Sequence, residues 1–229
     1  MRTVRYVALV VAVLVLGNFG NVSAVTQQKE VEELQKQPAG DAKPPSRHFR
    51  MSNTVVLEPG ETARIYDLIK GALAKGYATS GFIGADRYQL FTRHNDAPYV
   101  SATHGNHYLN NYSNDIAKNY GQFEKGIPLP VGSIIYKDSF AVTQTQQSFS
   151  KSSSRQIILG PLFIMRKMEK GFNDVTGDWQ YIQIQPDGEM LGMTGGEGAE
   201  RVEYCIGCHL AQEDFDHLYF VPEDRRLPQ

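Results

Sequence analysis

SIIYKDSFAVT (residues 133–143) and IILGPLFIMRKM (residues 157–168) are two long runs of β-branched, aromatic and other apolar residues. Such runs favour strands, and we expect residues 144–154 between them, rich in Gln and Ser, to be a loop. Shorter runs of the same kind are Tyr88–Arg93, Tyr99–Thr103, His107–Tyr112, Trp179–Gln185 and Met190–Met193. Strands that follow one another without long helices between them favour antiparallel pairing. The sequence therefore predicts an α+β fold, mainly an antiparallel β-sheet with a few helices, in a single domain.

Three helices are expected around these strands. Apolar residues at helical spacing predict the helix Gly60–Lys75, with Gly76 as its C-terminal cap. A short helix is expected at Asn114–Tyr120, with Ser113 or Asn114 as its N-cap. A C-terminal helix is expected at about Ala199–Gln212.

The C-terminal helix carries the two cysteines of the chain, in the motif Cys205-Ile206-Gly207-Cys208-His209. The pattern C-x-x-C-H is typical of a c-type haem attachment site. Two thiols add to the haem vinyl groups, the next imidazole binds the iron, and positions i, i+3 and i+4 share one side of a helix. We therefore expect one covalent haem c per chain, attached through Cys205 and Cys208, with His209 as the iron ligand.

Two other uses of the cysteine pair stay open. A redox dithiol normally follows a strand near the start of a βαβ unit, whereas this pair lies near the C-terminal end of the sequence. Structural zinc usually takes four N or S ligands, and a third cysteine does not exist here. His217, or His104 with His107, would have to complete a zinc site.

The first residues predict export. Arg2 and Arg5 precede the apolar run Val7–Leu16, and Val22-Ser23-Ala24 fits a small-residue cleavage site. We expect residues 1–24 to be a cleaved signal peptide, with a periplasmic or secreted product; an uncleaved anchor is the alternative. Haem c is attached outside the cytoplasm in bacteria, which agrees with export.

Composition fits one exported globular domain. Residues 25–50 are polar and proline-containing, which favours a flexible spacer, and residues 51–229 would form the domain. A formal net charge of −2 argues against nucleic acid or an anionic membrane as a partner. A hydrophobic content of 41% supports a core but is too low for a membrane protein.

The segment Gly132–Asp138 (GSIIYKD) resembles the G-x-x-x-x-K-E strand of the cytochrome P-460 family. Tyr112–Tyr120 is similar to that family's strand-then-helix lead-in. Further matching elements follow in the same order: Phe163 and Met165, Asp178-Trp179-Gln180-Tyr181, Cys205–His209, Asp216, and Tyr219-Phe220. The resemblance covers roughly Gly60 to Val221. It implies a mainly antiparallel sheet with one five-coordinate haem c against it, usually in a homodimer.

The resemblance also implies a second bond to the haem. In cytochrome P-460 a strand lysine is joined to the porphyrin edge, and Lys137 is the matching position. Lys137 shares a strand face with Ser133, Ile135, Ser139 and Ala141, so its stem would cross partly buried surface. A solvent-facing lysine is the alternative, and the related cytochromes c′-beta lack the link.

A five-coordinate iron leaves one face open to a small ligand. The resemblance implies an oxidoreductase that oxidises a small nitrogen compound such as hydroxylamine and passes electrons to an acceptor, for example a soluble redox partner. The alternatives are a non-catalytic, nitric oxide-binding protein of the c′-beta kind, and a simple electron carrier. The carrier would need a sixth ligand, for which the candidates are Met165, Met168, Met190, Met193, His104 and His107.

Hydroxylamine oxidation benefits from a distal carboxylate that accepts protons. The run Leu159–Met165 contains no acidic residue, and the first carboxylate after it is Glu169, the candidate catalytic residue. The alternative for Glu169 is a solvated loop charge. We expect His104 and His107 to be turn or surface residues, with a distal role open, and His48 and His94 to be exposed.

Overall fold

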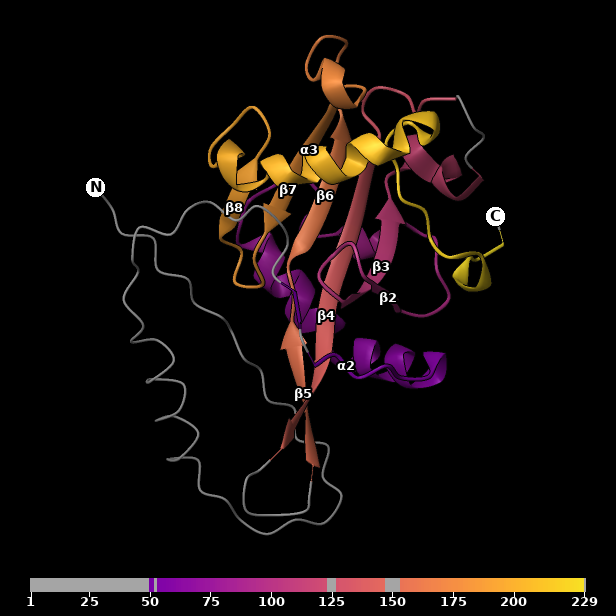
Figure 1. Ribbon diagram of the computed structural model, residues 1–229, viewed down its shortest axis with the longest axis vertical. Coiled ribbons are helices and arrows are strands. Elements are labelled where there is room, and N and C mark those ends of the chain that lie inside the picture. Colours follow the sequence, from indigo (N-terminus) through magenta and orange to yellow (C-terminus); the bar gives the residue numbers. More distant parts are fainter. Residues whose placement is uncertain (1–49, 52, 123–126, 147–152, 229) are drawn as a thin grey trace, which may run out of the picture.

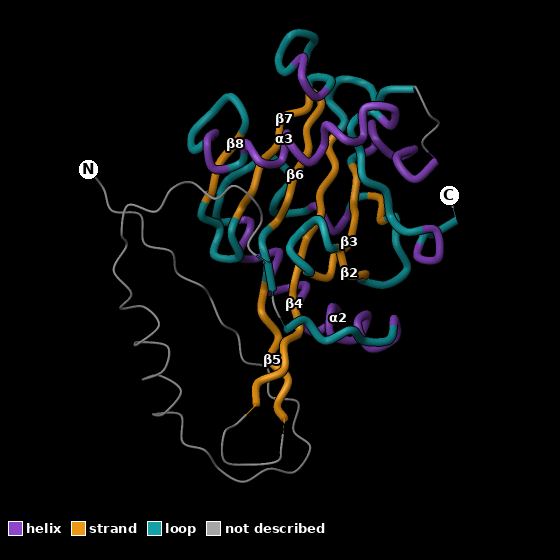
Figure 2. Tube along the Cα trace, viewed as in Figure 1, coloured by secondary structure: helices purple, strands orange, loops and turns teal. Residues whose placement is uncertain are grey.

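The computed structural model describes residues 50–51, 53–122, 127–146 and 153–228. Within them, eight strands form one antiparallel sheet in the order β1-β3-β4-β6-β7-β8, with β2 also on β3 and β5 also on β4 (Figures 1 and 2). The strands are β1 Thr92–Arg93, β2 Tyr99–Ser101, β3 His107–Ser113, β4 Ile134–Gln146, β5 Ser153–Leu159, β6 Leu162–Lys167, β7 Trp179–Ile184 and β8 Met190–Met193. The predicted fold class is confirmed. The predicted signal peptide lies outside the described residues, as does His48.

The helices are few and mostly short. The α-helices are α2 Pro59–Ala78 and α3 Glu203–His209, and the 3-10 helices are Tyr88–Leu90, Asp115–Gln122, Asp174–Thr176, Ala199–Arg201, Leu210–Phe215 and Glu223–Arg225. The predicted C-terminal helix is thus three consecutive pieces around α3. Part of the strand predicted from Tyr88 is also a 3-10 helix. The short helix after β3 has Asn114 as its N-cap, because the Asn114 side chain accepts the N–H of Ala117 (3.2 Å).

The predicted strand Ile157–Met168 is divided into two consecutive strands, β5 and β6, along the same edge of β4. β5 and β6 both pair with β4, and Phe140 faces Leu159, but the pairs in β6 are shifted by one residue. This β-bulge falls at Gly160 and Pro161, where proline cannot donate a ladder hydrogen bond. A Cβ on Gly160 would lie 2.2 Å from the Ser139 hydroxyl. The strands β4 and β5 also extend into both ends of the loop predicted at 144–154.

One face of the sheet packs against α2 (Figure 1). Tyr66, Ile69 and Leu73 of the helix are buried among side chains of β3, β4, β6 and β7. The helix passes through Gly76, so the prediction of a cap there is wrong. A Cβ on Gly76 would lie 1.9 Å from the carbonyl oxygen of Pro186, so this glycine lets the β7–β8 turn approach the helix.

The other face packs against α3 and the chain that follows it. In Figure 1, α3 and the short helices on either side of it together run across β8, β7, β6 and β4. The buried side chains on this face are Ala117, Tyr120, Leu129, Ile135, Met165, Trp179, Tyr181, Val202, Cys205 and Leu218. Because side chains alternate along a strand, β4 presents Ile135 and Lys137 to α3, and Tyr136 and Asp138 to α2.

Candidate haem site

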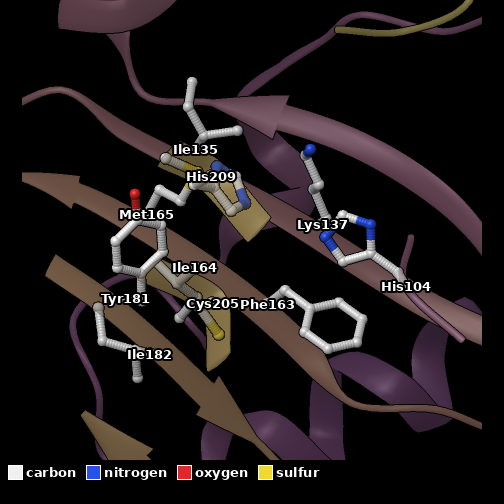
Figure 3. A pocket seen from close by; sticks show the side chains of 10 residues that line it. All are labelled: His104, Ile135, Lys137, Phe163, Ile164, Met165, Tyr181, Ile182, Cys205 and His209. Carbon is white, nitrogen blue, oxygen red and sulfur yellow. The ribbon is translucent and has the colours of Figure 1, made fainter. Parts of the chain in front are cut away.

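A cavity lies between the sheet and α3 (Figure 3). Its lining residues come from the turn before β3, from β4, β6 and β7, and from α3: His104, Ile135, Lys137, Phe163, Ile164, Met165, Tyr181, Ile182, Cys205 and His209. Lys137 from one predicted motif, and Cys205 and His209 from another, thus line the same cavity. The remaining lining is mostly apolar.

The motif helix α3 points two of its three reactive groups at this cavity. Cys205 and His209, at positions i and i+4, are both buried and line the cavity, whereas Cys208 is exposed. Burial, with a smaller contribution from the nearby Cys208 thiol, raises the pKa of Cys205 to about 12. Cys208 lies one turn after Cys205 on the same helix, with the exposed thiol outside the cavity lining.

The ring of His209 is oriented by the C-terminal segment. Its Nδ1–H donates to the carbonyl oxygen of His217 (2.5 Å), and its ring lies against Tyr181 and edge-on to Tyr219. A histidine that uses Nδ1 as a donor to a carbonyl presents Nε2 as its coordinating atom. This hydrogen bond fits the predicted role of His209 as an iron ligand.

Lys137 is buried, with 4% of its surface exposed. Its amine donates to the carbonyl oxygen of Tyr219 (3.1 Å), and burial lowers the pKa of Lys137 to about 7. The side chain faces Phe163 across the β4–β6 pair and shares the cavity with His209. The alternative of a solvent-facing lysine therefore does not hold for this structure.

Glu169 lies outside this cavity. It is exposed in the turn that follows β6, and Phe163, Ile164 and Met165 are the β6 residues that line the cavity. Within the described residues, no carboxylate lines the cavity. The catalytic role of Glu169 stays a prediction, which this position does not favour.

The histidines differ most from expectation. His104 and His107 lie near a turn, as predicted, but both are buried, and His104 lines the cavity with its ring centroid 4.9 Å from that of Phe163. His94 was expected to be exposed, which is wrong: its Nε2 hydrogen-bonds the Ser113 hydroxyl (2.7 Å). Burial lowers the pKa of His94 to about 4. The residues next to each of these histidines in the sequence do not indicate that its side chain is buried.

The family model of cytochrome P460 matches residues 88–220. This range contains the sheet, Lys137 and the C-x-x-C-H motif. The chain belongs to the cytochrome P460 family. Because this family binds haem, the protein is a haem protein. Among curated protein sequences, none matches the chain.

The residues at the cavity fit a haem of the family. The buried thiol of Cys205, the imidazole of His209 held by its Nδ1 and the buried side chain of Lys137 line a mostly apolar space, and the exposed second thiol, Cys208, lies on the same helix. The zinc alternative lacks support in the part of the chain that the structure describes, because no group of three or more His, Cys, Asp or Glu side chains is placed to hold a metal ion there. Among the same residues, none of the helices is long and apolar enough to cross a membrane.

Proposed function

We propose that this protein is an oxidoreductase that oxidises a small nitrogen compound, such as hydroxylamine, at one covalent haem c. The observation that carries the proposal is the position of Lys137. Its side chain lines the same cavity as Cys205 and His209, and the residue matches the lysine that in cytochrome P-460 is joined to the haem. When bound, the haem would supply an open iron position for the substrate and take up its electrons.

Different residues of the chain would hold the haem in different ways. Cys205 and Cys208 would form the thioether bonds, and His209 would bind the iron from the side of α3. Near pH 7 a substantial fraction of Lys137 is neutral, since burial lowers its pKa to about 7, and a neutral amine has a lone pair for bond formation. Joining that amine to a porphyrin carbon replaces an N–H and a C–H bond by an N–C bond. This removes two electrons and two protons, so the link needs an oxidant such as a peroxide during maturation.

Substrate oxidation also releases protons. Taking two electrons from hydroxylamine to the nitroxyl level releases two protons, and a one-electron redox protein would take up the electrons in two steps. Besides Lys137, Cys205 and His209, the titratable cavity residues are His104 and Tyr181. Burial raises the pKa of Tyr181 above its usual range, so its phenol stays protonated. His104 is therefore the better placed proton acceptor of the two.

Binding of nitric oxide without turnover is the second candidate function. The observation that favours it is the apolar lining supplied by Ile135, Phe163 and Met165, together with the exposed position of Glu169. An apolar pocket without a carboxylate retains a neutral gas but assists proton release poorly.

A spectrum of the ferrous protein distinguishes the two functions. The full chain is produced in a host with haem c maturation machinery, and wild type is compared with Lys137→Ala and with Lys70→Ala, an exposed lysine of α2. Oxidation predicts a broad, red-shifted Soret band and hydroxylamine-dependent reduction of a dye, both lost in Lys137→Ala and kept in Lys70→Ala. An ordinary high-spin spectrum, unchanged by Lys137→Ala, with nitric oxide binding and no turnover, would establish the second function instead.

The surroundings of the protein form part of the same proposal. The signal-like residues 1–24 and the haem c motif support export to the periplasm or beyond the cell, with no membrane attachment after cleavage. The electron acceptor would be a soluble redox protein, and the family resemblance supports a homodimer. N-terminal sequencing of the exported protein tests the cleavage of residues 1–24, and sizing chromatography tests the homodimer.

A further inference from the structure

The segment Asp216–Phe220 contacts two of the four side chains that would hold the haem, His209 and Lys137. The carbonyl oxygen of His217 accepts the Nδ1–H of His209 (2.5 Å). The carbonyl oxygen of Tyr219, two residues later, accepts the amine of Lys137 (3.1 Å). A single stretch of backbone therefore orients the iron ligand and the lysine, which come from α3 and β4.

A buried ion pair anchors the start of this segment. The amine of Lys167 lies 2.5 Å from Oδ1 of Asp216, and the two side chains are only 9% and 6% exposed. The second carboxylate oxygen accepts the backbone N–H of Leu129 (2.8 Å). The backbone carbonyl of Asp216 accepts the indole N–H of Trp179 (2.8 Å), and the Lys167 amine lies over the Trp179 ring.

The anchoring matters because the backbone here is strained. Asp216 and His217 have φ values of +52° and +59°, in the left-handed region that residues other than glycine rarely adopt. Each such residue costs roughly 1 kcal/mol, and the conformation persists only where its surroundings hold it. This conformation also places Nδ1 of His217 3.3 Å from the carbonyl oxygen of His209, so the two histidines contact each other reciprocally.

The other end of the segment is fixed as well. The Tyr219 carbonyl also accepts the hydroxyl of Tyr120, and the Tyr219 hydroxyl donates to the carbonyl of Cys208 (2.9 Å). The ring of Phe220 stacks on that of Tyr120. With both ends held, the two carbonyls keep a fixed spacing.

We propose that Lys167 and Asp216 are positioning residues of the haem site, whose ion pair holds the carbonyls of His217 and Tyr219 against His209 and Lys137. This inference rests on the proposed binding of haem by His209. A hydrogen bond from Nδ1 to a carbonyl raises the basicity of a histidine ligand and stabilises ferric iron. Loss of the ion pair should therefore raise the reduction potential of the haem and weaken the iron–histidine bond.

The test uses the full haem-loaded chain and compares Asp216→Asn with Asp214→Asn. Both variants lose one negative charge, but Asp214 is exposed and outside the segment. Mutation of the hydrogen-bond partners of a metal ligand commonly changes the metal affinity or the activity of a protein by tenfold or more. We expect Asp216→Asn to raise the ratio of ferrous to ferric haem at a fixed potential by about tenfold, equivalent to ~59 mV for one electron. The iron–histidine vibration of the ferrous protein should move to lower frequency, and Asp214→Asn should change neither.

A second variant separates positioning from stability. In Lys167→Met with Asp216→Leu, no buried charge is left unpaired, so the chain should fold even if the single variant does not. A shifted potential and vibration in this stably folded double variant support the proposal. Wild-type values for both, in either variant, would overturn it and leave the ion pair a purely structural contact. If the wild-type chain itself failed to attach haem, the proposed function would fail instead.

Discussion

Lys137 and Asp138 are neighbours in β4, both are buried, and they face opposite sides of the sheet. Asp138, facing α2, accepts hydrogen bonds from the hydroxyls of Tyr66 (2.5 Å) and Tyr88 (2.8 Å) and from the amide of Asn110 (2.9 Å). Lys137, facing α3, has the carbonyl of Tyr219 as its hydrogen-bond acceptor. One charged residue is surrounded by donors within the fold, and the next borders a cavity.

The difference shows how burial can serve two purposes. Burial raises the pKa of Asp138, while its hydrogen bonds to Tyr66, Asn110 and Tyr88 act in the opposite direction and make it part of the core. Burial lowers the pKa of Lys137 to about 7. A buried group with few partners in the protein is what a ligand site requires, and perturbed groups gather at such sites. The side chains on the α2 face thus stabilise the sheet, whereas the α3 face of the same sheet carries the residues that line the cavity.

Replacing both cysteines should have the largest effect, and on the α3 face alone. The variant Cys205→Ser with Cys208→Ser lacks both thioether bonds, so no haem should stay on the denatured chain in a peroxidase-stained gel, whereas wild type should stain. Haem that remained bound to the denatured variant would contradict the assignment of the motif. A wild-type band without stain would do the same.

Asp138→Ala tests the α2 face. It leaves the Tyr66 and Tyr88 hydroxyls and the Asn110 amide without their acceptor, so we expect a loss of about 3–5 kcal/mol in the free energy of unfolding. Denaturant unfolding of the haem-loaded protein measures it. Asp138→Asn keeps one acceptor oxygen and should lose less. An effect below ~1 kcal/mol for the alanine variant would show that the cluster contributes little.

His94 adds a buried group that is neutral in the folded state. Its pKa is about 4 when folded and about 6.5 when unfolded, so the unfolded chain binds more protons between these values. Its contribution is complete above pH 6.5 and is lost as the pH falls to about 4, by about 3 kcal/mol. Denaturant unfolding measured across this pH range should show that the unfolding free energy of His94→Gln changes less steeply with pH than that of the wild type. Equal slopes in the two proteins would mean that His94 is accessible to protons in the folded state.

Replacing one tyrosine by phenylalanine on each face should change the unfolding free energy least of all these variants. The two losses should nevertheless differ clearly between the faces. Tyr88→Phe removes a donor to Asp138 and should cost about 1–2 kcal/mol of unfolding free energy. In the part of the chain that the structure describes, the buried Tyr181 hydroxyl has no hydrogen-bond partner, so Tyr181→Phe should cost under ~0.5 kcal/mol. Equal losses in unfolding experiments would remove the distinction between the faces.

Part of the site could be predicted because it depends on the spacing of residues that are close together in the sequence. The C-x-x-C-H spacing places Cys205 and His209 on one side of a helix, and the strand alternation puts Ile135 and Lys137 on one face. Both follow from backbone geometry alone. Other features depend on residues far apart in sequence. The approach of Pro186 to the helix explains Gly76, and packing against Phe163 brings His104 to the cavity. Neither contact leaves a periodic signal.

By itself, the sequence determined the antiparallel α+β class, the motif helix and the family, because these depend on spacing along the chain. Only the tertiary structure decided that Lys137 and His209 line one cavity, that Glu169 lies outside it, and that Asp216 pairs with the distant Lys167. The physical reason is that burial and hydrogen-bond partners are set by which segments meet across the sheet, and local propensity does not encode that meeting.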